Sequence, residues 1–156
     1  FFFFSFSFFS FLPAPRLAEQ LTGACFFSLG LSLAICLFPP SIAITSILHL
    51  VLGDMMAALI GVSFGGDVCV VKLGRKGKKS AEGSVAMFIT CFFITVTVFG
   101  GVRLIEYTAF IAALVATITE LYSEEVFGLN DNLTIPLLSC AAMTWCFSRT
   151  VNCYDG

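Results

Sequence analysis

Five long apolar segments, separated by short polar stretches, constrain this chain more than any other feature of its sequence. None of them contains Lys or Arg, and none contains more than two acidic residues. A helix needs about 20 mostly apolar residues to cross the hydrocarbon core of a bilayer. The segments run from about Leu21 to Phe38, Ser41 to Phe64, Ser84 to Val102, Ile105 to Tyr122 and Thr134 to Phe147. The sequence therefore predicts an all-α fold, a polytopic transmembrane helix bundle of about five spans.

The composition supports this class and excludes others. Of the 156 residues, 58% are hydrophobic and only 12% are charged. Soluble domains carry about 25% charged residues, and disordered chains have low hydrophobicity with high net charge. The net charge of −2 is too small to indicate a nucleic-acid partner. We therefore expect a protein of the lipid bilayer.

The N-terminal run has an unusual composition. Residues 1–13 read FFFFSFSFFSFLP, and the chain begins with Phe, so we expect it to be a fragment. One hypothesis is a translated polypyrimidine tract, and the other is the tail of a truncated span. Transcript sequencing distinguishes them. We divide the chain into this segment (1–15), a transmembrane domain (16–148) and a short tail (149–156).

Basic residues are concentrated between the second and third apolar segments. Five of the eight lie there: Lys72, Arg75, Lys76, Lys78 and Lys79. Because cytoplasmic loops are enriched in Lys and Arg, this loop is predicted to be cytoplasmic. Alternation then places residues 16–19 and 120–131 on the same side, and the turns at 39–40 and 100–103 on the other. The polar chemistry thus gathers on one face, which suits a soluble cytosolic substrate.

Asp54 lies inside the second apolar segment. An ionisable group at membrane depth costs at least about 2.5 kcal/mol, so it is a candidate functional residue. Small residues surround it, Gly53, Ala57, Ala58 and Gly61, and these allow a helix or a ligand to approach closely. The alternative is that Asp54 only pairs with a polar group on a neighbouring helix.

The loop KLGRKGKKSAEGS (72–84) combines glycines, lysines and hydroxyls. Backbone N–H groups and ammonium groups in such a loop suit phosphate binding, although the Walker A spacing is absent. The serine and glycine residues before the apolar run also permit helix capping near Ser84. The alternative role is contact with anionic lipid headgroups.

A third polar segment, residues 120–137, supplies carboxylates and turn residues. Carboxylates near the membrane surface come from Glu120, Glu124, Glu125 and Asp131, and we interpret Glu124 and Glu125 as plain loop charges. These carboxylates are expected to face the basic loop on the same side. Carboxylates so placed can hold Mg²⁺ on a nucleotide. Asn130 to Asn132 are typical turn and cap residues, and an ordinary solvated loop is the alternative.

The cysteines and the single histidine do not predict a metal site. No Cys-x-x-Cys pair occurs among the seven cysteines, and His49 is the only histidine. We interpret the cysteines as small buried hydrophobic residues and His49 as a core histidine whose hydrogen bonds are satisfied.

Four short blocks, taken in order, resemble one enzyme family. They are EQLTGA (19–24), LVLGDMMAALIG (50–61), KKSAEGS (78–84) and DNLTIPL (131–137). In this order the chain resembles the CTP-dependent lipid-alcohol kinases, which include dolichol kinase, phytol and farnesol kinases and the fungal-type CTP-dependent diacylglycerol kinase. The resemblance covers about residues 16–147.

The resemblance implies transfer of the γ-phosphoryl group of CTP to the hydroxyl of a membrane lipid alcohol, with Mg²⁺ as cofactor. Asp54, Asp131 and Lys79 would be catalytic, and the two aspartates would hold the metal. The nucleotide would contact Lys78, Lys79, Ser80, Gly83 and Ser84. Residues expected to line the site are Glu19, Thr22, Gly53, Ala58, Gly61, Glu120, Asn132 and Thr134.

The chain departs from the family pattern in two places, and two other functions stay open. A basic, His-containing segment that usually precedes the first block is replaced by the Phe-rich run, and Met55 and Met56 stand where small residues are usual. A cytidylyltransferase that forms CDP-lipids would use a similar loop, and a transporter or scaffold would use none of this chemistry. The lipid alcohol and the membrane (endoplasmic reticulum, plastid envelope or bacterial plasma membrane) are not chosen by the sequence.

Overall fold

The computed structural model describes residues 14–64, 72–73, 79–101, 105–122 and 130–152, so the Phe-rich run lies outside the described residues. Apart from one short ladder, the described elements are helices. They are α2 (Ala14–Leu37), α3 (Pro40–Leu48), the π-helix η2 (His49–Gly53), α4 (Asp54–Phe64), β1 (Lys72–Leu73), β2 (Lys79–Ser80), α5 (Ala81–Val98), α6 (Ile105–Tyr122) and α7 (Asp131–Asn152). The prediction of an all-helical fold is confirmed.

Three helices in the described part of the chain are long and apolar enough to cross a membrane. They are Pro40–Ser63, which takes in α3, η2 and most of α4, then Ala81–Val98 and Ile105–Tyr122. In α2 the apolar stretch is the shorter Leu21–Leu37. The 22 residues of α7 include polar residues at both ends, from Asp131 to Arg149, which lowers its mean hydropathy.

The start of the second span differs from the prediction. We expected Ser41 to cap it, but the helix begins at Pro40, and Pro39 precedes it without a side-chain cap. Proline is favoured in the first helical turn because its missing N–H has no partner there in any case. Ser41 lies within the helix, and its carbonyl accepts a hydrogen bond from Thr45 Oγ1 at 2.7 Å.

Helices α5 and α7 begin earlier than the third and fifth predicted segments, since polar residues before them act as caps. Ser80 Oγ accepts the Gly83 N–H at 3.1 Å, so α5 begins at Ala81. Asn130 Oδ1 accepts the Asn132 N–H at 3.1 Å, so α7 begins at Asp131. The predicted fifth segment was too short, because α7 continues to Asn152.

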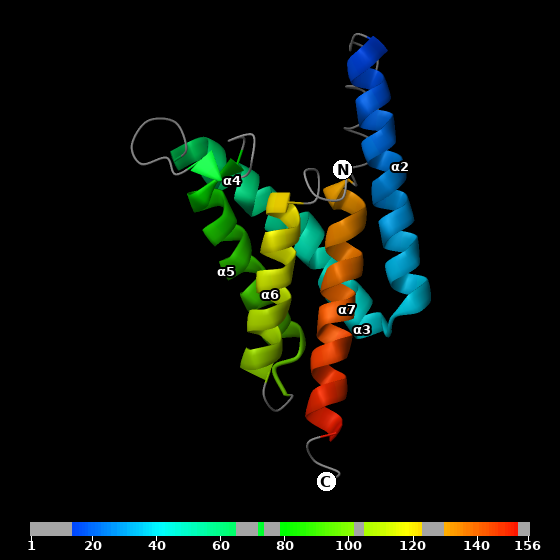
Figure 1. Cartoon of the computed structure of the whole chain (residues 1–156), viewed down its shortest axis with the longest axis vertical. Coiled ribbons are helices and arrows are strands. Elements are labelled where there is room, and N and C mark those ends of the chain that lie inside the picture. Colours follow the sequence, from blue (N-terminus) through cyan, green and yellow to red (C-terminus); the bar gives the residue numbers. More distant parts are fainter. Residues whose placement is uncertain (1–13, 65–71, 74–78, 102–104, 123–129, 153–156) are drawn as a thin grey trace.

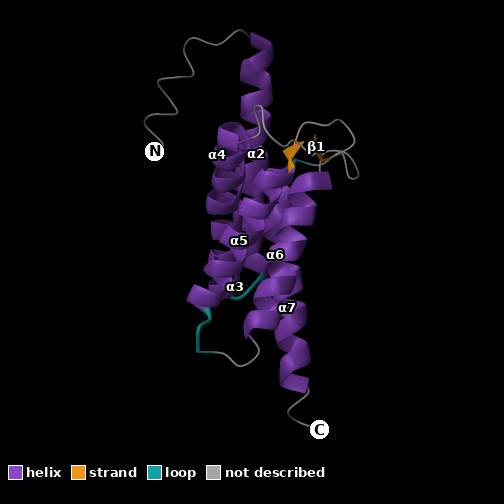
Figure 2. Cartoon of the chain, turned by 90° about the vertical axis from the view of Figure 1, so that its left-hand side faces the viewer, coloured by secondary structure: helices purple, strands orange, loops and turns teal. Residues whose placement is uncertain are grey.

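The helices pack as neighbours in a fixed order. α5 lies between α4 and α6, α6 packs on α7, and α7 packs on α2 and α3 (Figures 1 and 2). Two apolar clusters form the core. One is centred on Leu50, Met87, Cys91 and Ile135, and the other on Ala43, Ala112, Cys140 and Met143. Cys25 and Cys36 on α2 are exposed, so the interpretation of all cysteines as buried was wrong for these two.

Candidate functional site

The predicted polar blocks meet at one end of the bundle. Figure 1 shows the end of α4, the start of α5, the end of α6 and the start of α7 together at the top, beside the β ladder. The ladder pairs Lys72 with Ser80 and Leu73 with Lys79, and it closes the basic loop at the start of α5. The turns around Pro39 and Gly100 lie at the other end.

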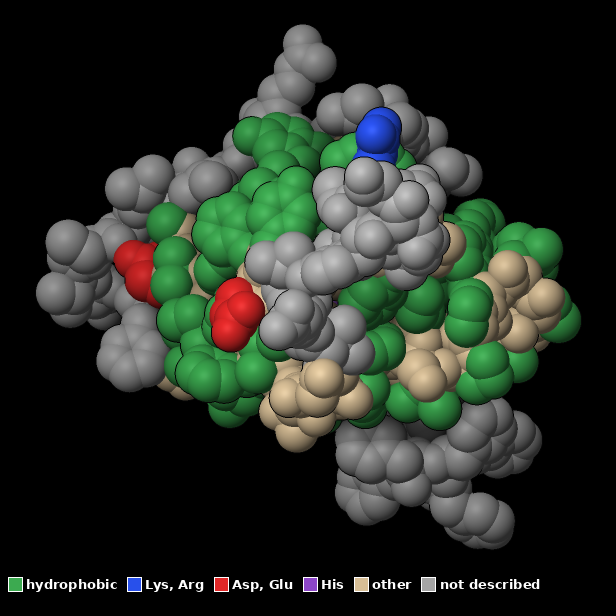
Figure 3. Space-filling model, turned by 90° about the horizontal axis from the view of Figure 1, so that it is seen from below, with side chains coloured by type: hydrophobic (Ala, Val, Ile, Leu, Met, Phe, Trp, Pro, Cys, Tyr) green, Lys and Arg blue, Asp and Glu red, His purple; other side chains and the backbone are tan. Residues whose placement is uncertain are grey.

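Among the described residues, few charged side chains are visible at the opposite end of the molecule (Figure 3). Seen from that end in Figure 3, the described side chains are mostly hydrophobic. This distribution matches the asymmetry that the sequence predicts. The candidate site therefore belongs to the upper end of Figure 1.

Three glycines bring α4 and η2 into close contact with α5. A Cβ added to Gly83 would lie 2.7 Å from the Ala57 carbonyl oxygen, and one on Gly61 would lie 3.0 Å from Ser80 Oγ. A Cβ on Gly53 would lie 2.9 Å from Cys91 Sγ. Gly53 and Gly61, predicted to line the site, thus face α5, so the small residues allow a helix to approach.

The two serines predicted to contact the nucleotide build the start of α5. Besides the cap from Ser80 to Gly83, Ser84 Oγ donates to the Ser80 carbonyl at 3.2 Å. Ser84 is 8% exposed. Both hydroxyls are therefore engaged in local hydrogen bonds that fix the first turn of α5 beside the basic loop.

Asp54 is the first residue of α4 and is exposed on the side of the helix that α5 leaves open. Ala58, one turn later, is also exposed. Residues four apart share one face of a helix. Asp54 and Ala58 therefore open onto the same outer surface, while Gly53 and Ala57 next to them are buried against α5.

The start of α7 is tied to α2 by Asn132. Its side-chain Nδ2 donates to the Gly23 carbonyl at 3.5 Å, while its backbone N–H donates to Asp131 Oδ1 at 2.9 Å. Thr134 is 6% exposed, and its hydroxyl donates to the Asn130 carbonyl at 3.3 Å. The structure thus brings the first and fourth sequence blocks together, with Thr22 exposed beside the Gly23 contact.

Two glutamates lie where α5 and α6 meet. Glu120, near the end of α6, is only 6% exposed. Glu82, in the first turn of α5, also has a carboxylate oxygen shielded from solvent. We did not single out Glu82 from the sequence, although it lies within the KKSAEGS block. The sequence signal that could have identified Glu82 as a site residue is its acidic side chain within a block of basic and small residues.

A metal site built from protein groups alone is not present among the described residues, because no three His, Cys, Asp or Glu side chains converge there. Mg²⁺ is commonly held by one or two carboxylates together with substrate phosphates. Asp54 and Asp131 are the two aspartates that the sequence predicts for that second arrangement. Ile135, one turn after Asp131, shares an apolar cluster with Leu50 and Ala57, which flank Asp54 along the helix.

Some predicted site residues are described incompletely or not at all. Lys78 lies outside the described residues. Lys79 belongs to β2 and Glu19 to α2, with only their backbone placed. The pairing of β1 with β2 nevertheless places the backbone of Lys72 and Lys79 at the start of α5.

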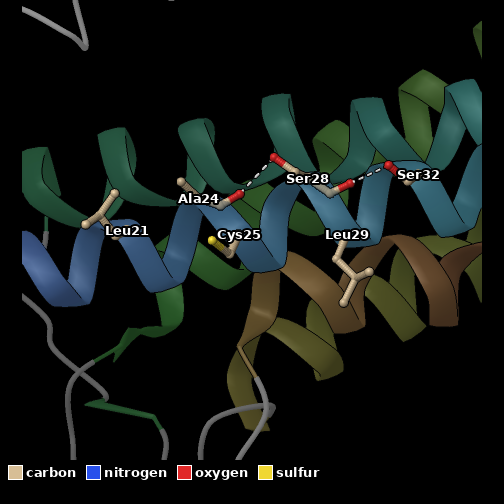
Figure 4. A pocket seen from close by; sticks show the side chains of 6 residues that line it. All are labelled: Leu21, Ala24, Cys25, Ser28, Leu29 and Ser32. Carbon is tan, nitrogen blue, oxygen red and sulfur yellow. Dashed lines mark hydrogen bonds between the residues drawn. The ribbon is translucent and has the colours of Figure 1, made fainter.

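A hollow of about 490 Å³ lies on α2 and is lined by Leu21, Ala24, Cys25, Ser28, Leu29 and Ser32. Figure 4 shows that both serine hydroxyls bond along the helix, Ser28 to the Ala24 carbonyl at 3.0 Å and Ser32 to the Ser28 carbonyl at 2.8 Å. The hydroxyl hydrogens are therefore already used. The residues that line this hollow are apolar or hydroxyl-bearing, and none of them has a charge that could bind a nucleotide phosphate.

Comparison with curated proteins finds an uncharacterized protein of Rickettsia prowazekii (strain Madrid E), which is 34% identical over 126 residues. The match takes in 80% of this chain, and the chain spans 58% of the length of that relative. No family model matches the chain. No solved structure matches it either.

Proposed function

We propose that this chain is part of an integral membrane kinase that transfers the γ-phosphoryl group of CTP to a membrane lipid alcohol. In this proposal about five helical segments cross the bilayer. Three meet the requirements of length and apolarity. α2 and α7 join them because α7 packs on both α2 and α6, which aligns all five in one bundle.

One observation carries the proposal: four sequence blocks that are far apart in the chain converge at one end of the bundle. The contact of Gly61 with Ser80 joins the second block to the third, and the contact of Asn132 with Gly23 joins the fourth to the first. Glu120 lies at the same end. Phosphoryl transfer depends mainly on positioning and charge neutralisation, and this end has the necessary residue types.

The proposed reaction divides the work among these groups. Lys78, Lys79 and the start of α5 would hold the CTP phosphates, and Asp54 and Asp131 would hold Mg²⁺ with phosphate oxygens. The lipid oxygen forms a bond to the γ-phosphorus, while the bond to the β–γ bridging oxygen breaks. CDP leaves, and the alcohol proton passes to a carboxylate of the site or to water. The products are a lipid phosphate and CDP.

The outer surface of α4 supports an approach from the bilayer. Asp54 is exposed on this helix together with Met55, Leu59 and Val62, which are 50%, 56% and 83% exposed. Apolar side chains of this kind suit contact with lipid tails. A lipid hydroxyl at headgroup depth would reach Asp54 sideways, without entering the packed interior of the bundle.

The test is an assay of the full-length protein in proteoliposomes with γ-labelled CTP against dolichol, phytol, farnesol and diacylglycerol. We expect label in one lipid and release of CDP. Release of pyrophosphate from CTP, with formation of a CDP-lipid when a lipid phosphate is supplied, would instead support a cytidylyltransferase. No transfer to any lipid would contradict the kinase and favour a transporter or scaffold.

A further inference from the structure

The helix that carries Asp54 contains a π turn at His49–Gly53. A buried stripe runs through it: Ile42, Ser46, His49, Gly53 and Ala57. Ala43, Thr45 and Leu50 widen this buried face. A π-helix bonds i to i+5, so the turn at His49–Gly53 is wider than the α-helical turns on either side of it. Gly53 and Ala57 are buried against α5.

Side chains of α5 hold this turn in place. His49 Nε2 lies 2.9 Å from Thr95 Oγ1, and the Thr95 hydroxyl donates to the Cys91 carbonyl at 3.0 Å. With the Thr95 hydroxyl donating to the Cys91 carbonyl, the matching arrangement has the ring hydrogen on Nε2, which then donates to Thr95 Oγ1. Cys91 Sγ lies 3.9 Å from the His49 carbonyl oxygen, which it meets as a weak donor.

His49 is the buried core histidine that the sequence predicted, but its hydrogen bonds are satisfied only in part by the residues that the structure describes. It is completely buried, and Nε2 is bonded, but Nδ1 has no hydrogen-bond partner among the described residues. A buried acceptor without a partner costs free energy. The hydrogen bond of Nε2 with Thr95 joins the π turn to α5.

Asp54 follows the π turn directly. The Asp54 N–H donates to the carbonyls of Leu50 and Val51, so its backbone is part of the hydrogen bonding that ends the turn. Without the wider turn, the residues after it would be rotated about the helix axis relative to the residues before it. The carboxylate of Asp54 would then leave its present direction relative to α5.

We propose that His49 is a positioning residue: its hydrogen bond to Thr95 holds the π turn and thereby sets the direction of the Asp54 carboxylate. The catalytic consequence rests on the proposed function, while the effect on Asp54 does not. His49 is fully buried, so it acts through Asp54 and the turn.

The first test compares His49→Leu and Thr95→Val with His49→Gln in the full-length protein in nanodiscs. A glutamine can place an N–H near the position of Nε2. We expect His49→Leu and Thr95→Val to lower kcat at least tenfold and to leave the KM for CTP within twofold of the wild-type value. His49→Gln should keep kcat within threefold of the wild-type value. Thr108→Val is the matched control, since Thr108 is also buried and its hydroxyl has no hydrogen-bond partner among the described residues. It should keep wild-type kcat.

The second test reads the direction of residue 54 without any assay of activity. In an Asp54→Cys background, the rate of modification by a charged methanethiosulfonate is measured by peptide mass spectrometry, with exposed Cys25 as the internal reference. We expect His49→Leu to change the rate ratio at least threefold and His49→Gln to leave it within 1.5-fold. If CTP transfer is absent but the ratio changes, the kinase proposal fails and the positioning role of His49 stands. An unchanged ratio in His49→Leu overturns the positioning role.

Discussion

Gly30 of α2 lies directly against the backbone carbonyl of Asn132 in the first turn of α7, so close that a Cβ on Gly30 would be 2.7 Å from that oxygen. The same carbonyl has lost its usual helical partner. In an α-helix it would accept the N–H of residue 136, but that residue is Pro136, which has none. The close approach of α2 therefore covers a carbonyl that α7 cannot satisfy itself.

Gly30→Ala should consequently destabilise the protein, although alanine is normally the better helix former by about 1 kcal/mol. The added methyl group meets backbone atoms, which cannot rotate away, and we expect a loss of about 1–3 kcal/mol. Thermal unfolding in detergent measures it. Gly23→Ala in the same helix is the control, since its nearest contact would be an ordinary 3.8 Å. Equal stability of the two variants would contradict the close packing of α2 on α7.

The contact between α4 and α5 makes a second, graded prediction. Gly83→Ala would place its methyl 2.7 Å from the Ala57 carbonyl oxygen, so we expect a loss of about 1–3 kcal/mol. Gly61→Ala meets Ser80 Oγ at 3.0 Å, and a side-chain atom can shift slightly. Gly61→Ala should therefore cost less than Gly83→Ala. Unfolding midpoints of both variants decide the order, and the reverse order would mean that Gly61 is the tighter contact.

The sequence predicted the helical class and most spans because apolar length is a strong local signal. Residues 105–122 were predicted with the bounds that α6 has in the structure. The π turn was not foreseen, because no local pattern marks it, and His49 contacts Thr95, 46 residues further along the chain. The starts of α5 and α7 were missed by three residues each because the caps at Ser80 and Asn130 precede the apolar runs.

For the candidate site, the sequence named residue types but not their partners. It offered two uses for the small residues around Asp54, and the structure directs Gly53 and Gly61 to α5. It grouped Ser80 with the phosphate-binding loop, while the structure uses its hydroxyl to cap α5. Whether a small or polar residue contacts another helix or a ligand depends on which helix packs against it. The local sequence pattern does not specify that neighbour.

The orientation of the bundle gives a third prediction. If the basic loop faces the cytoplasm, a cysteine at position 76 should react only with reagent supplied from that side. A cysteine at position 41, exposed near the opposite end, should react only from the other side. Lys76→Cys and Ser41→Cys, assayed in right-side-out and inverted vesicles, measure this. Labelling of both positions from one side would contradict an odd number of crossings between Ser41 and the loop.

The candidate site itself makes the last prediction. Asp54→Asn, Lys79→Ala and Asp131→Asn should each lower the rate of lipid phosphorylation by about 100-fold or more, as expected when one charge-stabilising group is removed. Each variant should still insert into the membrane, because the apolar segments are unchanged. Glu106→Gln is the matched control: it also neutralises an acidic residue in the first turn of a helix, but at the end of the bundle away from the site. It should keep the rate within twofold. The rates come from γ-labelled CTP assays on equal amounts of inserted protein, and wild-type rates in all three site variants would contradict the assignment.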